Sequence, residues 1–175
     1  MRTQQRGRTV TAIVLLFLAI ITPVVCIVRQ TQFTQQCGGY LKQTADATSV
    51  ELALERINLA IEYIEKNDLK DGYTSILWKT ENENIGFWYR NVIACRDELA
   101  ANLDSSSLEQ SNVLMKVREA LTDDGDSGLE LTVPPGISRY PHNTGYCVLN
   151  IISAILALIA LKLLCGDDSL ISYLF

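Results

Sequence analysis

The sequence has little of what most catalytic and metal sites need. It contains one histidine, His142, and no serine in a G-x-S-x-G nucleophile motif. A lone histidine cannot supply the ligands of a zinc site, and no two of the five cysteines have metal-ligand spacing. The acids are spaced as on solvated helix faces and have no histidine partners. We therefore predict a non-enzymatic protein with no cofactor and no metal ion.

An excess of positive charge is also lacking. The chain has 15 Lys and Arg against 20 Asp and Glu, a net charge of −5. Nucleic-acid-binding proteins carry basic stripes, so we predict no nucleic-acid partner. The acidic DDGDSG segment, Asp123–Gly128, does not fit a calcium loop, because the twelfth position is Pro134 where a glutamate is needed. It is predicted to be an acidic turn.

Charge is absent altogether from the run Val10–Val28. Its 19 residues come close to the ~20 that a helix needs to cross a bilayer. Pro23 is compatible with a membrane helix. The alternative, a cleaved signal peptide, fits the basic start. However, the run is longer than a typical signal and no small-x-small site follows it. We predict an uncleaved transmembrane helix over residues 10–28.

A second apolar run begins at Tyr146 and is uncharged to Leu161. It predicts a second transmembrane helix over residues 146–165, with the ammonium of Lys162 reaching the interface. Asn150 either bonds to the first helix or lies near the membrane interface, and we favour the interface. A buried core helix is the alternative for the whole run.

The flanking charges predict the orientation. Arg2, Arg6 and Arg8 favour a cytoplasmic tail over residues 1–9. Two spans then make residues 29–145 extracytoplasmic and residues 166–175 a second cytoplasmic tail. The middle region carries 11 Lys and Arg against 18 Asp and Glu, which is compatible with translocation. A bacterial inner (plasma) membrane is the setting that we predict.

Two apolar stripes with helical spacing lie between the runs. The first predicts a helix from Thr44 to Lys66, after a hinge at Gly38-Gly39. The second predicts a helix over residues 85–103, antiparallel to the first. The first stripe consists of Ala47, Val50, Leu54, Ile57, Ile61 and Ile64, and the second of Ile85, Trp88, Val92, Cys95 and Leu99.

A third helix is predicted to begin at a capping box, Ser106-x-x-Glu109, and to end near Leu121. Its inward residues are expected to be Leu114, Val117 and Leu121. Alternation over residues 129–133 predicts a short strand, with Tyr73–Trp78 as its candidate partner. The predicted fold class is mainly α, with two transmembrane helices flanking an extracytoplasmic helical domain. That domain is an antiparallel helix pair plus a third helix, with room for a short two-stranded β piece.

Two groups of residues are candidates for binding. The GFWYRN segment suggests a partner or ligand surface, although core packing is the more common role of such aromatics. The second group precedes or lies within the last apolar run, where aromatic and basic residues anchor to lipid headgroups. The surface candidates are Phe87, Trp88, Tyr89, Arg90 and Arg96, and the membrane-interface candidates are Arg139, Tyr140, His142, Tyr146 and Lys162.

The cysteines leave three alternatives open. Cys37 and Cys95 can form a disulfide in an oxidising compartment. Cys37 with Cys147 is a second pairing. We favour the third alternative, in which all five thiols stay free and act as small apolar side chains.

A resemblance extends over much of the middle region. Glu51–Ile93 holds GYTS, WKT and GFWY segments, and Val133–Pro141 reads VPPGISRYP. In these segments the chain resembles a group of uncharacterised bacterial two-span membrane proteins with a helical extracytoplasmic domain. The resemblance implies a bacterial envelope protein of the same architecture. It implies no activity and transfers no functional residue.

The first functional hypothesis is a non-enzymatic, membrane-anchored envelope protein. Its helical domain would contact a protein partner, or a second copy through coiled-coil-like helices, while the bilayer holds its anchors. The alternative is a sensor-like or small-ligand-binding module acting through membrane partners, with a pocket near Trp88, Arg90 and Arg96. An enzyme using His142 is the least favoured hypothesis.

Overall fold

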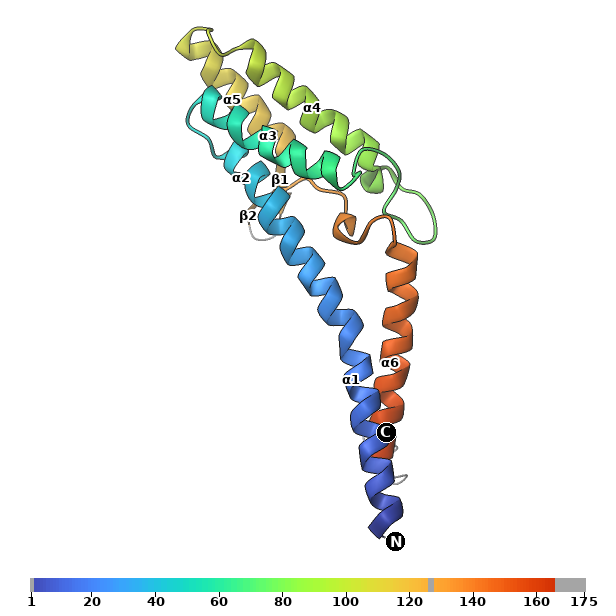
Figure 1. Ribbon diagram of the computed structural model, residues 1–175. Helices are drawn as coiled ribbons and strands as arrows, with labels where there is room; N and C mark the ends of the chain where they lie inside the picture. The colour runs from blue at the N-terminus through green and yellow to red at the C-terminus, as the bar shows by residue number, and fades with distance from the viewer. Residues whose placement is uncertain (1, 126–127, 166–175) are drawn as a thin grey trace. The chain divides into compact units, whose positions relative to one another are not determined.

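The chain forms two compact units, which we describe separately (Figure 1). In this computed structural model the described residues are 2–125 and 128–165. The apolar helix pair consists of Met1–Val28 with His142–Phe175, and the helical domain is Arg29–Pro141. The predicted tail 166–175 and two residues of the predicted acidic turn, 126–127, lie outside the described residues. The described chain is mainly helical, as predicted, with one small sheet.

The apolar helix pair contains α1 (Arg2–Phe33), up to Val28, and α6 (Asn143–Cys165). Both helices are long and apolar enough to cross a membrane. The large apolar side chains of both helices point outward. Small buried side chains recur seven residues apart on each helix, Ala12 and Ala19 on α1 and Ser153 and Ala160 on α6, and Asn143 is also buried at the start of α6.

Asn150 contacts the first helix, which is the alternative that we favoured less; its depth relative to the membrane interface stays a prediction. Its Nδ2 lies 3.7 Å from Sγ of Cys26 on α1 and donates to the carbonyl of Tyr146 at 2.8 Å. A polar amide in apolar surroundings is stabilised by such partners. Asn150 therefore turns inward, toward the other helix of the pair.

The helical domain begins with a continuation of α1. A π-helical segment, η1 (Thr34–Gly38), leads directly into α2 (Gly39–Ala45). The predicted hinge at Gly38-Gly39 is wrong, since both glycines are helical and the Gly39 N–H donates to the Thr34 carbonyl. Gly38 is buried, and a Cβ there would lie 3.8 Å from Cδ1 of Leu131. That distance is an ordinary van der Waals contact, so the packing at Gly38 has room for a methyl group.

The central helix α3 (Val50–Lys66) starts six residues later than predicted. The chain leaves α2 at Asp46 and re-enters a helix at Ser49, whose side chain accepts from the Leu52 N–H at 3.2 Å. A capped break therefore divides the predicted helix. The buried residues of α3 are Val50, Ala53, Ile57, Ala60, Ile61 and Ile64, whereas Leu54 is half-buried.

The next two helices match their predictions closely. α4 (Ile85–Ala101) buries all five residues of the second stripe and runs back along α3 (Figure 1). α5 (Ser107–Leu121) begins at the predicted capping box. It buries Val113, Val117 and Leu121 and packs on α2, α3 and α4, while Leu114 is half-buried. These helices enclose the core of the domain.

The sheet is a local hairpin, so the predicted long-range strand pairing is wrong. β1 (Thr122–Gly125) pairs antiparallel with β2 (Gly128–Leu131), and Thr122 faces Leu131. Tyr73 instead forms an isolated bridge with Asn84, after the short helix η2 (Glu81–Glu83). Closing a short hairpin costs less chain entropy than pairing across half the domain. That favours the local partner.

The first and last segments of the helical domain are joined. η3 (Ile137–Arg139) lies near its end, and Ser138 Oγ donates to Oε1 of Gln30 at 2.6 Å. Ser138 is buried. The domain thus closes on itself close to both points where the chain continues into the apolar helix pair.

Candidate functional site

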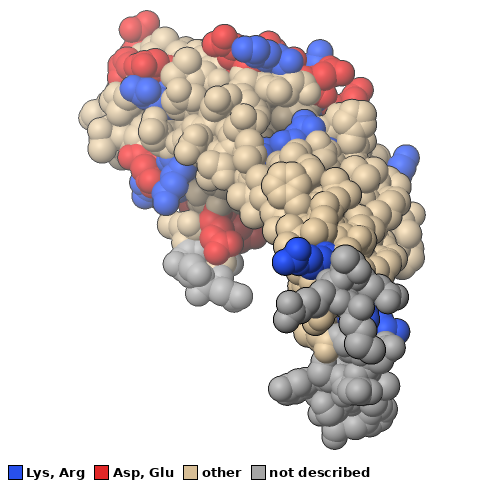
Figure 2. Space-filling view, turned by 60° about the horizontal axis from the view of Figure 1, so that its bottom comes forward, with Lys and Arg blue, Asp and Glu red and all other residues tan. Residues whose placement is uncertain are grey.

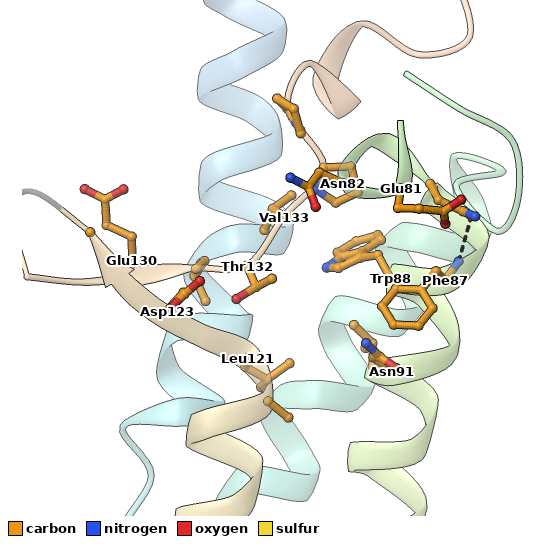
Figure 3. A pocket seen from close by; sticks show the side chains of 17 residues that line it. Glu81, Asn82, Phe87, Trp88, Asn91, Leu121, Asp123, Glu130, Thr132 and Val133 are labelled. Atoms are coloured by element: carbon orange, nitrogen blue, oxygen red, sulfur yellow. Dashed lines mark hydrogen bonds between the residues drawn. The ribbon is translucent and has the colours of Figure 1, made fainter. Parts of the chain in front are cut away.

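The helical domain contains a groove between α4 and the hairpin (Figure 3). Its volume is about 460 Å³. One wall comes from η2 and the first turns of α4, and the other from β1, β2 and the segment 132–135 that follows. The described lining residues central to the argument are Glu81, Phe87, Trp88, Asp123, Glu130 and Leu131.

Trp88 presents an unused hydrogen-bond donor to this groove. Its side chain is 5% exposed, and Nε1 has no hydrogen-bond partner among the described residues. In Figure 3 the indole extends from α4 toward the opposite wall, with its nitrogen facing the hollow. A buried N–H without an acceptor costs about 1–3 kcal/mol, and Nε1 itself is closed to solvent at the groove wall.

Phe87 forms an apolar part of the groove rim. It is 54% exposed, unlike its neighbour Trp88. The first turn of α4 is fixed by Asn84, whose Oδ1 accepts from the Phe87 N–H at 2.9 Å (Figure 3). The two aromatic residues therefore project from a rigid helix start, one inward and one toward solvent.

The charged groups that line the groove are all acidic. They are Glu81, Asp123 and Glu130, and no described lining residue is Lys, Arg or His. Elsewhere on the domain, acidic and basic side chains are interspersed (Figure 2). The local excess of carboxylates favours a positively charged ligand.

The groove also borders a strand edge. Among the described residues, β2 pairs with β1 alone, and Glu130 and Leu131 of β2 line the groove. A two-stranded sheet has an open edge on each strand, and extended peptides add to such edges.

The structure brings two of the five predicted surface residues, Phe87 and Trp88, into the groove. Tyr89 lies on another face of α4, where its hydroxyl donates to Oε1 of Glu65 at 2.9 Å. Desolvation, and then this bond, raise the pKa of Tyr89. Arg96 pairs with Asp97 at 2.6 Å, and Arg90 is exposed. Of the three residues proposed for a ligand pocket, Trp88 lines the groove, whereas Arg90 and Arg96 do not.

The predicted interface residues fall in both units. In the helical domain, Arg139 ends η3 and Tyr140 packs against the core. In the apolar helix pair, His142 is exposed just before α6, Tyr146 is half-buried on it, and Lys162 is exposed in its last turn.

Neither predicted disulfide is formed. Cys37, Cys95 and Cys147 are free thiols, and the first two are buried. Burial, with a smaller effect of the Glu98 carboxylate, raises the pKa of Cys95 to about 11. Within the described part of the chain no three His, Cys, Asp or Glu side chains are grouped to hold a metal ion.

Sequence reasoning missed the acidic and hairpin side of the groove. Glu81, Asp123 and Glu130 come from segments that are far apart in sequence or were predicted as turns. The fold alone brings them together. Only the GFWYRN aromatics indicated the site.

Comparison with known protein families, with curated proteins and with solved structures gave no match to this chain.

Proposed function

We propose that this protein is a membrane-anchored binding module whose groove takes an extended, positively charged peptide segment of a partner protein. α1 and α6 hold it in a bacterial inner membrane, with both ends cytoplasmic and the helical domain outside. Two features support the anchoring: the length and apolarity of both helices, and the outward direction of their large side chains.

The unpartnered Nε1 of Trp88 is the observation that carries the proposed binding function. When the groove wall moves aside to expose Nε1, a peptide carbonyl accepts one hydrogen bond from this donor, and the open edge of β2 offers further backbone partners. Basic side chains of the peptide would lie near Glu81, Asp123 and Glu130. Phe87 would pack against an apolar side chain of the peptide. The role assigned here is non-enzymatic.

An array of nonapeptides of randomised sequence tests this proposal, probed with the labelled full-length protein in nanodiscs. We expect the bound peptides to be enriched in Lys and Arg. Trp88→Phe keeps most of the ring volume but removes the donor, and it should weaken binding about tenfold. Glu81→Gln with Glu130→Gln should weaken binding and reduce its salt dependence.

Leu108→Ala provides the matched control, since Leu108 is exposed on α5 and does not line the groove. This variant should bind as the wild type does. Equal binding by wild type and Trp88→Phe, or a bound set without basic residues, would refute the peptide groove. Saturable binding of a small organic cation in place of the peptides would favour the small-ligand alternative. The volume of the groove also lies within the range of small-molecule pockets.

A further inference from the structure

The segment between α3 and α4 exposes an apolar tip that the groove does not use. It consists of Ile76, Leu77 and Trp78, whose exposed fractions are 42%, 80% and 74%. We name these residues the 76–78 tip. Three consecutive large apolar side chains exposed to water are unfavourable, and such patches mark contact surfaces.

The base of this loop is well fastened. The Thr74 N–H donates to the Glu83 carbonyl at 3.0 Å, and the Ile85 N–H donates to the Gly72 carbonyl at 3.0 Å. The side chain of Asn84 donates to the Tyr73 hydroxyl at 3.3 Å. The two ends of the loop are thus held together, so the tip projects from a closed base.

The same base contacts the segment that leads to α6. Gly72 has φ +94° and lies so close to the Tyr140 hydroxyl that a Cβ there would overlap it. α6 begins at Asn143, three residues after Tyr140. A chain of six residues spans at most about 20 Å, so the tip stays within that distance of Gly72. The tip is therefore tethered to a residue that contacts Tyr140, three positions before α6 begins.

The composition of the loop fits a lipid surface. From Gly72 to Thr80 the only charged residue is Lys79, whose Nζ lies 4.9 Å from the centroid of the Tyr73 ring. The acids Asp71 and Glu81 lie at the base, outside this stretch. Tryptophan, tyrosine and lysine are the residues that settle at headgroup level, and a cation there is attracted to anionic lipids.

We infer that the 76–78 tip inserts into the membrane interface and forms a third contact of this protein with the bilayer. This inference rests on the proposed membrane location of α1 and α6, and it is independent of the peptide groove. The partner of the tip is lipid: the boundary between headgroups and acyl chains of the membrane that holds α1 and α6.

Tryptophan fluorescence of the full-length protein tests this inference in vesicles of phosphatidylcholine and phosphatidylglycerol. The chain has two tryptophans, and Trp88 is buried. Brominated phosphatidylcholine should quench the wild type, and this quenching should be lost in Trp78→Phe. Iodide in the aqueous phase should quench Trp78 weakly.

Leu108→Trp in the Trp78→Phe background is the matched control. Leu108 is 71% exposed, nearly as much as Trp78, but lies on α5. Its indole should be quenched by iodide and not by bromolipid. Iodide quenching of Trp78 without bromolipid quenching would overturn the inference. The tip would then be a contact surface for a protein partner. Extraction of the protein by alkaline carbonate would instead contradict the proposed anchoring itself.

Discussion

The two units of this molecule distribute their side chains in opposite ways. The helical domain buries large apolar residues such as Ile57 and Leu99 and keeps its charges at the surface. The apolar helix pair buries small side chains, such as Ala19 and Ser153, and turns its large ones outward. Water drives the first arrangement, whereas association through small residues is favoured when the surroundings are as apolar as the helices.

The two units therefore obtain their stability from different sources. Apolar burial stabilises the helical domain, so deleting buried methyl groups should be costly there. In lipid that driving force between helices is absent, and close packing with a few polar contacts replaces it. The same kind of substitution should therefore have different effects in the two units.

The largest expected effect comes from Ile57→Ala in α3. Ile57 is fully buried, so the cavity should lower the free energy of unfolding by about 2–5 kcal/mol. Ile155→Ala removes the same atoms from an exposed position on α6 and should change stability little. Urea unfolding of the full chain in detergent, followed by circular dichroism, measures both. Equal losses would contradict the comparison.

Thiol reactivity gives the next largest difference. The rise in the pKa of Cys95 from 9.0 to about 11 lowers its thiolate fraction roughly 100-fold, and burial slows maleimide further. In the folded protein, maleimide should label Cys95 slowly. In urea, Cys95 should be labelled at the rate of an unfolded chain. Mass spectrometry of labelled peptides measures the rates. Fast labelling of folded protein would contradict the burial.

The same shift predicts sensitivity to alkali. The folded domain keeps the Cys95 thiol protonated, whereas the unfolded chain ionises it at lower pH. Its contribution to stability is therefore complete below about pH 9 and is lost as the pH rises toward about 11. Melting temperatures measured across this range should fall less steeply in Cys95→Ala. If the melting temperatures of wild type and Cys95→Ala fall in parallel, ionisation of Cys95 is not the cause of the alkaline loss of stability.

Loss of the α5 cap should have a smaller effect. Ser106→Ala should cost about 1 kcal/mol, since it removes the side chain that accepts from the Glu109 N–H. Hydrogen bonds from Ser106 lower the pKa of Glu109 in the folded protein. The stabilising contribution of this carboxylate is therefore lost as the pH falls through its lowered, folded-state pKa. Ser111→Ala is the control, and acid titration of the melting temperature should separate the two variants.

The smallest effect is expected within the apolar helix pair. Asn150→Leu removes the contact with Cys26 and should cost about 0.6 kcal/mol, as polar contacts between membrane helices usually do. Hydrogen exchange of α1 and α6 in nanodiscs should increase slightly. Ile151→Leu, an exposed neighbour, should leave exchange unchanged. A loss as large as that of Ile57→Ala would show that the pair depends on this contact.

Sequence patterns predicted those elements whose burial repeats with a regular period. α4 shows this best, because all five residues of its stripe are buried. α5 was predicted from its capping box, which depends on two residues only. Both signals are local, so no knowledge of the tertiary structure was needed.

Other elements depend on contacts that no local pattern encodes. The stripe from Ala47 onward did not reveal that Ser49 caps a new helix after α2. Asp123–Gly128 was predicted as a turn, yet pairing with β2 makes Thr122–Gly125 a strand. The groove was missed for the same reason, since its acidic wall exists only once the hairpin faces α4.

The hydrogen bond between Gln30 and Ser138 has a consequence for engineering. Because it joins the beginning and the end of the helical domain, the fold does not require the chain to enter and leave at these points. Domains with adjacent ends tolerate excision and circular permutation. Residues 29–141 can thus be joined end to end by a short linker and reopened elsewhere, for example at the exposed Asp104 between α4 and α5. The two apolar helices would then be replaceable attachments to an independent fold.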